Sequence, residues 1–489
     1  MKKNVSNNFL KHFMVIGSGT LINMILGLLT TPIITRIVNP VEYGKLSIFT
    51  MYSNIALLVL CLGLDQALVR YYYENDDKIY KKKLLFKCIK LPVLVSIFIT
   101  VFVILTSKFD IINYEFDTLI MSLLCIYTII QIIYRFSTAI VRLEYNTKLF
   151  SKLNVFLKLF YIIIVLPLVL IFQKNYLLLL VIATVISAFI CLIISITAQI
   201  KIWNFFENDN SNNTKIISEK KLLKYAYPYI ISMSITTLFQ AIDKISLNYY
   251  YTYAEVGIYS STMSLVHIFA IIQTTFNTLW MPMAIENYTK NPDNKDFYQK
   301  GNKIITIVMF FLGVTLILVK DLFAVLLGTK YREAAYILPF LIFNPIMYTI
   351  SETTVGGLVF KEKSKLQVIV ALGACLTNII GNFLLVPKFG CQGAAISTGI
   401  SYIVFFTLRT IFANKYYYIN FNLKKFYLLT FITVLYAAYN TFIKFNFISV
   451  IFYIIVCIVM ICLYKETMIF TYNYIKKIIT KILTRRNEK

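Results

Sequence analysis

Long apolar stretches separated by short polar connections make up almost the whole chain. A helix needs about 20 mostly apolar residues to span a bilayer, and fourteen stretches of roughly that length follow one another. They lie at 13–38, 46–69, 86–107, 117–141, 149–172, 176–200, 224–250, 255–285, 303–319, 334–354, 364–386, 391–413, 425–443 and 447–464. We therefore predict an all-α membrane protein with about fourteen transmembrane helices.

The composition supports this prediction and excludes two other classes of protein. Apolar residue types make up 58% of the chain and charged types 15%, and the mean hydropathy is +0.72. Soluble domains carry about 25% charged residues, and disordered chains have low hydrophobicity. The eight cysteines are scattered without a CxxC pair, and the chain has two histidines. A soluble enzyme and a disordered chain are thus excluded, and neither a disulfide framework nor a metal site is indicated.

The net charge of +25 predicts an orientation in the membrane. In a soluble chain this excess would suggest nucleic acid as a partner, but basic residues also concentrate in the cytoplasmic loops of membrane proteins. If the N-terminus is cytoplasmic, most of the 48 lysines and arginines fall in inward segments, including Lys81–Lys83, Lys220–Lys224 and the tail Lys476–Arg486. We expect a multi-pass protein of the bacterial cytoplasmic membrane with both termini cytoplasmic, an uncleaved first span and no nucleic-acid partner.

The first six predicted spans repeat as the next six. VEYGKLS at 41–47 aligns without gaps with AEVGIYS at 254–260, and the same shift of 213 positions places spans one to six on spans seven to twelve. An even number of spans keeps both halves in the same orientation, as in transporters built from parallel repeats with the substrate bound between them. The predicted divisions are bundles at 1–200 and 224–414, a cytoplasmic linker at 201–223, and helices 13 and 14 with a basic tail at 415–489.

Several short motifs resemble those of one family. They are TPIITR at 31–36 followed by PVEYG at 40–44, QAIDK at 240–244 leading to EVGIY at 255–259, and PKFGCQGAAIS at 387–397. The last is the most specific, and its Gly390 and Gly393 also indicate a tight turn between helices. The chain resembles the Wzx-type polysaccharide biosynthesis flippases, in the superfamily that also contains the MATE multidrug antiporters and the lipid II flippases.

The resemblance implies both a fold and a substrate. The fold would be MATE-like, with a V-shaped pair of six-helix bundles around a cavity that opens alternately to each side, and two further C-terminal helices. The substrate would be an undecaprenyl-diphosphate-linked oligosaccharide, flipped for assembly of O-antigen, capsule or a similar surface polysaccharide. Membrane lipid and a polysaccharide polymerase are the partners that the resemblance implies.

Polar and charged residues inside the predicted spans are the candidate site. A charge at a helix centre costs roughly 2.5–3.5 kcal/mol by insertion scales, so it normally faces a partner or a wet cavity. Arginine and lysine would compensate the charge of a diphosphate. The candidates for lining a substrate cavity are Arg36, Asp65, Arg70, Arg135, Lys158, Gln240, Asp243, Lys244 and His267.

Structural roles are the alternative for the same residues. Arg70 lies at a span end, where arginine commonly snorkels to the interface. Arg135, Lys158 and Lys244, together with Arg36 and Asp243, fit a cavity lining and buried ion pairs equally well. For His267 we favour a packed polar residue, with proton coupling as the alternative.

Two other functions compete with the flippase. A drug or metabolite cation antiporter on the same fold would need an acidic cavity, which Asp65 and Asp243 can supply, but the deep cations outnumber the acids. A membrane glycosyltransferase or polymerase would be expected to carry a large outward loop or domain, and no connection is long enough. The chain has no GxxxxGK[ST] motif for ATP. We therefore expect a transporter without a cofactor rather than an enzyme, and coupling to H+ or Na+ is left open.

Overall fold

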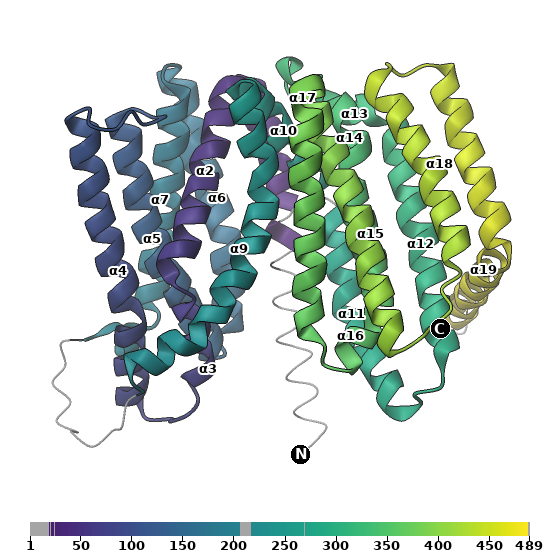
Figure 1. The fold of residues 1–489 in the computed structure, drawn as a ribbon, viewed down its shortest axis with the longest axis horizontal. Helices are drawn as coiled ribbons and strands as arrows, with labels where there is room; N and C mark the ends of the chain where they lie inside the picture. The colour runs from purple at the N-terminus through teal and green to yellow at the C-terminus, as the bar shows by residue number, and fades with distance from the viewer. Residues whose placement is uncertain (1–18, 20, 24, 206–216, 268, 488–489) are drawn as a thin grey trace. The chain divides into compact units, whose positions relative to one another are not determined.

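The structure is a computed structural model that describes residues 19, 21–23, 25–205, 217–267 and 269–487. All regular structure in these residues is helical. The chain divides into two compact units, Met1–Ala241 and Ile242–Lys489 (Figure 1). The division falls inside one long helix, α9, which spans Glu219–Tyr250.

The first unit contains nine helices or parts of helices among the described residues. They are the helix Leu21–Ile37, α2 (Pro40–Cys61), α3 (Leu64–Tyr71), α4 (Lys78–Lys108), α5 (Thr118–Leu143), α6 (Thr147–Phe172), α7 (Tyr176–Thr197), α8 (Ile200–Trp203) and the first part of α9. Many of their apolar side chains point outward, such as Phe98 and Leu94 on α4, which are 73% and 54% exposed. Exposed apolar surface of this kind is what a lipid-facing helix presents.

A sharp break separates α2 from α3. Leu62 and Gly63 both have left-handed backbone angles, with φ of 52° and 65°. A Cβ on Gly63 would lie 2.8 Å from the carbonyl oxygen of Ala226 on α9, so only glycine fits this close approach. The break starts a new helix directly before Asp65.

The second unit contains the remaining helices. They are the end of α9, α10 (Tyr253–Val266), α11 (Phe269–Lys290), α12 (Lys295–Leu318), α13 (Lys320–Leu326), the short 3-10 helix η1 (Thr329–Tyr331), α14 (Ala334–Leu341), α15 (Phe343–Thr354), α16 (Gly356–Phe360), α17 (Ser364–Tyr416), α18 (Leu423–Phe442) and α19 (Phe447–Asn487). Helix α17 is two helices joined at Gly390, whose φ and ψ are 53° and −131°. A Cβ on Gly393 would lie 2.4 Å from the carbonyl oxygen of Leu385. The turn predicted at Gly390 and Gly393 is therefore present.

The predicted all-α membrane architecture is confirmed, with corrections to two spans. Ten helices of the described residues are long and apolar enough to cross a membrane, and one of them, α17, covers two predicted spans. The spans predicted at 46–69 and 255–285 are each divided between two helices. The span predicted at 334–354 is present as the single apolar span Ala334–Thr354, in which one residue, Ile342, separates α14 from α15. Glycine explains the break in the first of these spans. The number of fourteen crossings stays a prediction.

The sequence repeat has a structural counterpart in each unit. In the first unit, the Glu42 carboxylate accepts a hydrogen bond from the backbone N–H of Leu177, at the start of α7, at 3.1 Å. In the second unit, the Glu255 carboxylate accepts one from the backbone N–H of Cys391, just after the Gly390 turn, also at 3.1 Å. Both glutamates thus cap the start of the sixth helix of their repeat, where a negative charge is favourable.

Candidate functional site

The first unit holds an ion pair between Asp65 at the start of α3 and Arg135 on α5. Arg135 donates a hydrogen bond from Nε to the carboxylate oxygen Oδ2 at 2.8 Å, and its Nη2 lies 2.7 Å from the same oxygen in the ion pair. The Asp65 side chain is 6% exposed, whereas that of Arg135 is 33% exposed. The Arg135 guanidinium is therefore anchored along one edge and stays partly exposed.

The two partners of this pair are satisfied to different degrees. Oδ1 of Asp65 is buried and has no hydrogen-bond partner among the described residues, while Oδ2 also accepts from Gln66 Nε2 at 2.9 Å. Arg135 Nη2 contacts the sulfur of Met233 at 3.8 Å. No described residue accepts from Arg135 Nη1, which leaves that edge available to an anion.

The other three candidate cations of the first unit, Arg36, Arg70 and Lys158, differ from Arg135. Arg70 is exposed and lies 3.7 Å from Glu74 across one helical turn, which suits a snorkelling anchor. Lys158 is half-buried on α6, with Nζ 5.9 Å from the ring centre of Tyr161. Arg36 is exposed near the end of its helix. Neither Lys158 nor Arg36 forms an ion pair with a described residue.

The second unit holds a buried carboxylate within a shell of neutral donors. Asp243 on α9 is 5% exposed. Its Oδ2 accepts from the hydroxyls of Tyr259 at 2.6 Å and Thr398 at 2.7 Å. Its Oδ1 accepts from the side-chain amides of Asn382 at 2.7 Å and Asn378 at 3.1 Å. Four hydrogen bonds satisfy the carboxylate without a salt bridge to any described residue.

The remaining candidates do not join this shell. Lys244 follows Asp243 on α9, is half-buried, and has no ion-pair partner in the described part of the chain. Gln240, earlier on the same helix, is exposed. His267 is exposed directly after the last residue of α10.

A second buried ion pair was not anticipated. Arg409 on α17 donates from Nη1 to Glu352 on α15 at 2.8 Å and to the Ser351 hydroxyl at 2.7 Å. Its guanidinium carbon also lies 5.4 Å from the ring centre of Phe405. Both charges lie inside predicted spans, so the rule that singled out Arg135 would have found them. The spacing of Asn378 and Asn382, which places both on one helix face, was a further missed signal.

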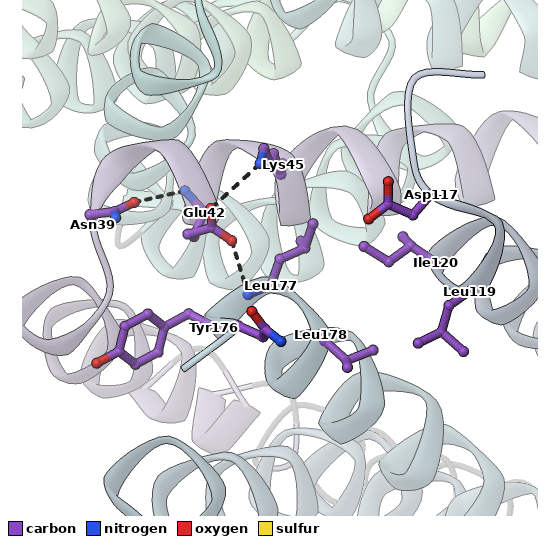
Figure 2. A pocket seen from close by; sticks show the side chains of 10 residues that line it. Asn39, Glu42, Lys45, Asp117, Leu119, Ile120, Tyr176, Leu177 and Leu178 are labelled. Atoms are coloured by element: carbon purple, nitrogen blue, oxygen red, sulfur yellow. Dashed lines mark hydrogen bonds and ion pairs between the residues drawn. The ribbon is translucent and has the colours of Figure 1, made fainter. Parts of the chain in front are cut away.

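A polar cavity of about 420 Å³ lies where α2, α5 and α7 begin. Figure 2 shows Glu42 at its centre, joined to Lys45 and to the backbone N–H of Leu177. Asn39 caps α2 through a 2.9 Å hydrogen bond from the backbone N–H of Glu42. Because these contacts hold helix ends together, we assign the Glu42 cluster a structural role.

The fold is that of a MATE-like transporter, as predicted. The lipid II flippase MurJ, in an inward closed conformation, superposes with a TM-score of 0.68 at 16% identity, covering 94% of this chain and 99% of that chain. A mutant of the Vibrio cholerae MATE transporter VcmN superposes with a TM-score of 0.53 at 13% identity, covering 84% of this chain and 97% of that chain. At these identities the likeness establishes the fold alone.

Sequence comparison places the chain in a family. The family profile described as polysaccharide biosynthesis protein matches residues 9–288, and the chain belongs to that family. The capsular polysaccharide biosynthesis protein CapF of Staphylococcus aureus is 22% identical over 378 residues, which are 76% of this chain and 91% of CapF. The uncharacterized membrane protein MJ1068 of Methanocaldococcus jannaschii is 25% identical over 290 residues, so the match spans only about half of each chain, 55% and 56%. The family predicted from the short motifs is confirmed.

Proposed function

We propose that this protein flips a prenyl-diphosphate-linked oligosaccharide across the cytoplasmic membrane by alternating access. The observation that carries the proposal is its membership of the polysaccharide biosynthesis family over residues 9–288. The fold supports it, because a lipid II flippase shares that fold over nearly the whole chain. Undecaprenyl diphosphate as the carrier, the surface polymer served, and a polymerase as partner belong to the same proposal.

Unpaired cations supply the chemistry that a diphosphate needs. Its charge cannot cross hydrocarbon without compensation. Arg36, Lys158 and Lys244 lie on helices and form no ion pair with a described residue, so their charge is available to a substrate. Arg135 would add its free Nη1 edge, held in position by Asp65. In the proposed topology, Arg135 and Lys158 meet the diphosphate from the cytoplasmic side and Arg36 and Lys244 hold it on the outer side.

Asp243 is our proposed site of ion coupling. Its shell consists of hydroxyl and amide groups, each of which carries an oxygen, the ligand atom that hard cations prefer. A proton taken up by the carboxylate would equally change the shell, because one acceptor would become a donor. Either event couples the charge of Asp243 to the packing of α9 against α10 and α17.

The geometry disfavours the cation antiporter. Both acids that this alternative needs are already engaged, Asp65 by Arg135 and Asp243 by four hydrogen-bond donors. Neither therefore presents an open carboxylate to an organic cation, while three of the candidate cations, Arg36, Lys158 and Lys244, form no ion pair with a described residue.

A deletion strain tests the proposal. Without the protein, complete prenyl-diphosphate oligosaccharides should be trapped in the inner leaflet, where an impermeant glycan-modifying reagent on spheroplasts cannot reach them. Complementation with Lys244→Gln should fail. Lys108→Gln, a matched charge loss at the exposed end of α4, should restore export. Unchanged precursors in the deletion strain, or full function of Lys244→Gln together with Lys158→Gln, would overturn the proposal.

A further inference from the structure

A small pocket lies where the amino-terminal part of α4 meets the beginning of α9, both in the first unit. Its volume is about 220 Å³. Its lining combines two lysines and one glutamate with several leucines, among them Lys87, Lys90, Leu91, Leu94, Glu219 and Leu223. None of these residues belongs to the proposed transport site.

The two lysines lie on one face of α4. Lys87 and Lys90 are three residues apart, which places them on neighbouring turns of the same side. Lys87 Nζ donates to the carbonyl oxygen of Ile217 at 3.1 Å, just before α9, and an ammonium retains two further donors. Lys90 is exposed and forms no hydrogen bond or ion pair within the described residues. The pocket therefore offers several N–H donors to an anion.

The leucines place the pocket at the edge of the hydrocarbon. Leu91, Leu94 and Leu223 are 38%, 54% and 37% exposed. The preceding turns of α4 carry Lys81–Lys83, whereas the following turns are apolar as far as Leu105. Lys87 and Lys90 thus lie at the level where lipid headgroups meet acyl chains, with an apolar surface continuing on one side only.

We propose that this pocket binds the phosphate of an anionic glycerophospholipid, with the acyl chains lying along the leucines of α4. Basic pockets between membrane helices are recognised lipid headgroup sites. Two lysines and Glu219 leave one net positive charge, which matches the single charge of a phosphodiester better than the higher charge of a prenyl diphosphate. A lipid held here would bridge α4 and the start of α9. In the proposed orientation it comes from the cytoplasmic leaflet.

Lipid binding to the purified full-length protein tests this inference. Native mass spectrometry would measure the dissociation constant of phosphatidylglycerol, with phosphatidylcholine as the zwitterionic comparison. A direct ion pair between an exposed lysine and a phosphate changes an affinity by up to about fivefold. Lys87→Gln and Lys90→Gln should each weaken phosphatidylglycerol binding by about fivefold and the double variant by about thirtyfold, while Lys90→Arg should retain it.

The control variant removes two positive charges, as the double variant does, from the same end of the first unit. Lys220 and Lys224 are exposed on the first turns of α9 and do not line the pocket, so Lys220→Gln/Lys224→Gln should bind phosphatidylglycerol normally. If Lys87→Gln unfolds the protein because its contact with Ile217 is lost, the binding measured with Lys90→Gln alone tests the inference. Equal binding by Lys90→Gln and the control variant would overturn the inference. Loss of prenyl-diphosphate binding with unchanged phosphatidylglycerol binding would overturn it too. The readout is lipid binding, so it does not depend on whether the protein flips oligosaccharides.

Discussion

The ion pair between Asp65 and Arg135 predicts an unequal response to removal of its two partners. Arg135→Gln would leave the Asp65 carboxylate 6% exposed, with Gln66 as its remaining partner and Oδ1 already unpaired among the described residues. Removing one partner of a buried pair costs about 3–5 kcal/mol, because an uncompensated charge stays buried. We expect Arg135→Gln to fall in this range.

Asp65→Asn should be milder. The Arg135 side chain is 33% exposed, so water can solvate the guanidinium when its counter-ion is lost. What disappears is mainly the charge-assisted hydrogen bonding, worth about 1.5–3 kcal/mol. The double variant Asp65→Asn/Arg135→Gln leaves two neutral amides and should recover about 2 kcal/mol relative to the sum of the single variants.

Unfolding in detergent measures these differences. Helical circular dichroism during a titration with sodium dodecyl sulfate would give the free energy of unfolding for the four proteins of the cycle. The reasoning would be refuted if Asp65→Asn lowered the free energy of unfolding as much as Arg135→Gln does. It would also be refuted if the loss in the double variant equalled the sum of the losses in the two single variants. The first result would mean that Arg135 is as buried as its partner, and the second that the two side chains are not coupled.

Three further changes test other parts of the structure. Asp243→Asn should fold but transport poorly whatever ion gradient is imposed, because an amide carries no charge to bind a proton or cation; gradient-dependent transport equal to the parent protein would contradict this. Arg409→Gln should destabilise the protein by about 3–5 kcal/mol, since Glu352 is 7% exposed; the same detergent titration should show partial recovery in Glu352→Gln/Arg409→Gln, and no recovery would exclude a coupled pair. Gly390→Ala should cost about 1–3 kcal/mol, because its φ of 53° and ψ of −131° suit glycine; an unchanged unfolding curve would show that the turn is not strained.

Much of the fold could be predicted because a membrane imposes a simple pattern on the sequence. Apolar stretches near 20 residues marked the helices, and Gly390 marked the turn inside α17. The interruption between α14 and α15 has a local signal, because Pro345 cannot donate a hydrogen bond to the carbonyl of Leu341. The break in span 255–285 could not be predicted from local pattern, because His267 is followed by an apolar run. Packing against other helices, rather than local propensity, sets such boundaries.

The candidate residues could be selected from the sequence, but their contacts could not. Charges inside apolar stretches identified Asp65, Arg135 and Asp243. Three of the four donors to Asp243, however, lie 135, 139 and 155 residues away in sequence, on α17, whose pairing with α9 no local pattern reveals. The anchoring of Arg135 by Asp65, 70 residues earlier, likewise depends on how α3 and α5 pack.

The most direct test of the central claim is transport by the purified protein alone. Proteoliposomes would receive a prenyl-diphosphate oligosaccharide in both leaflets, and an impermeant glycan-modifying reagent added outside would measure how much becomes accessible over time. The flippase account predicts that the active protein brings the inner pool to the reagent, and that empty liposomes and Lys244→Gln/Lys158→Gln expose only the outer half. An inner pool that stays protected with folded, correctly inserted protein, under imposed proton and sodium gradients, would contradict the account.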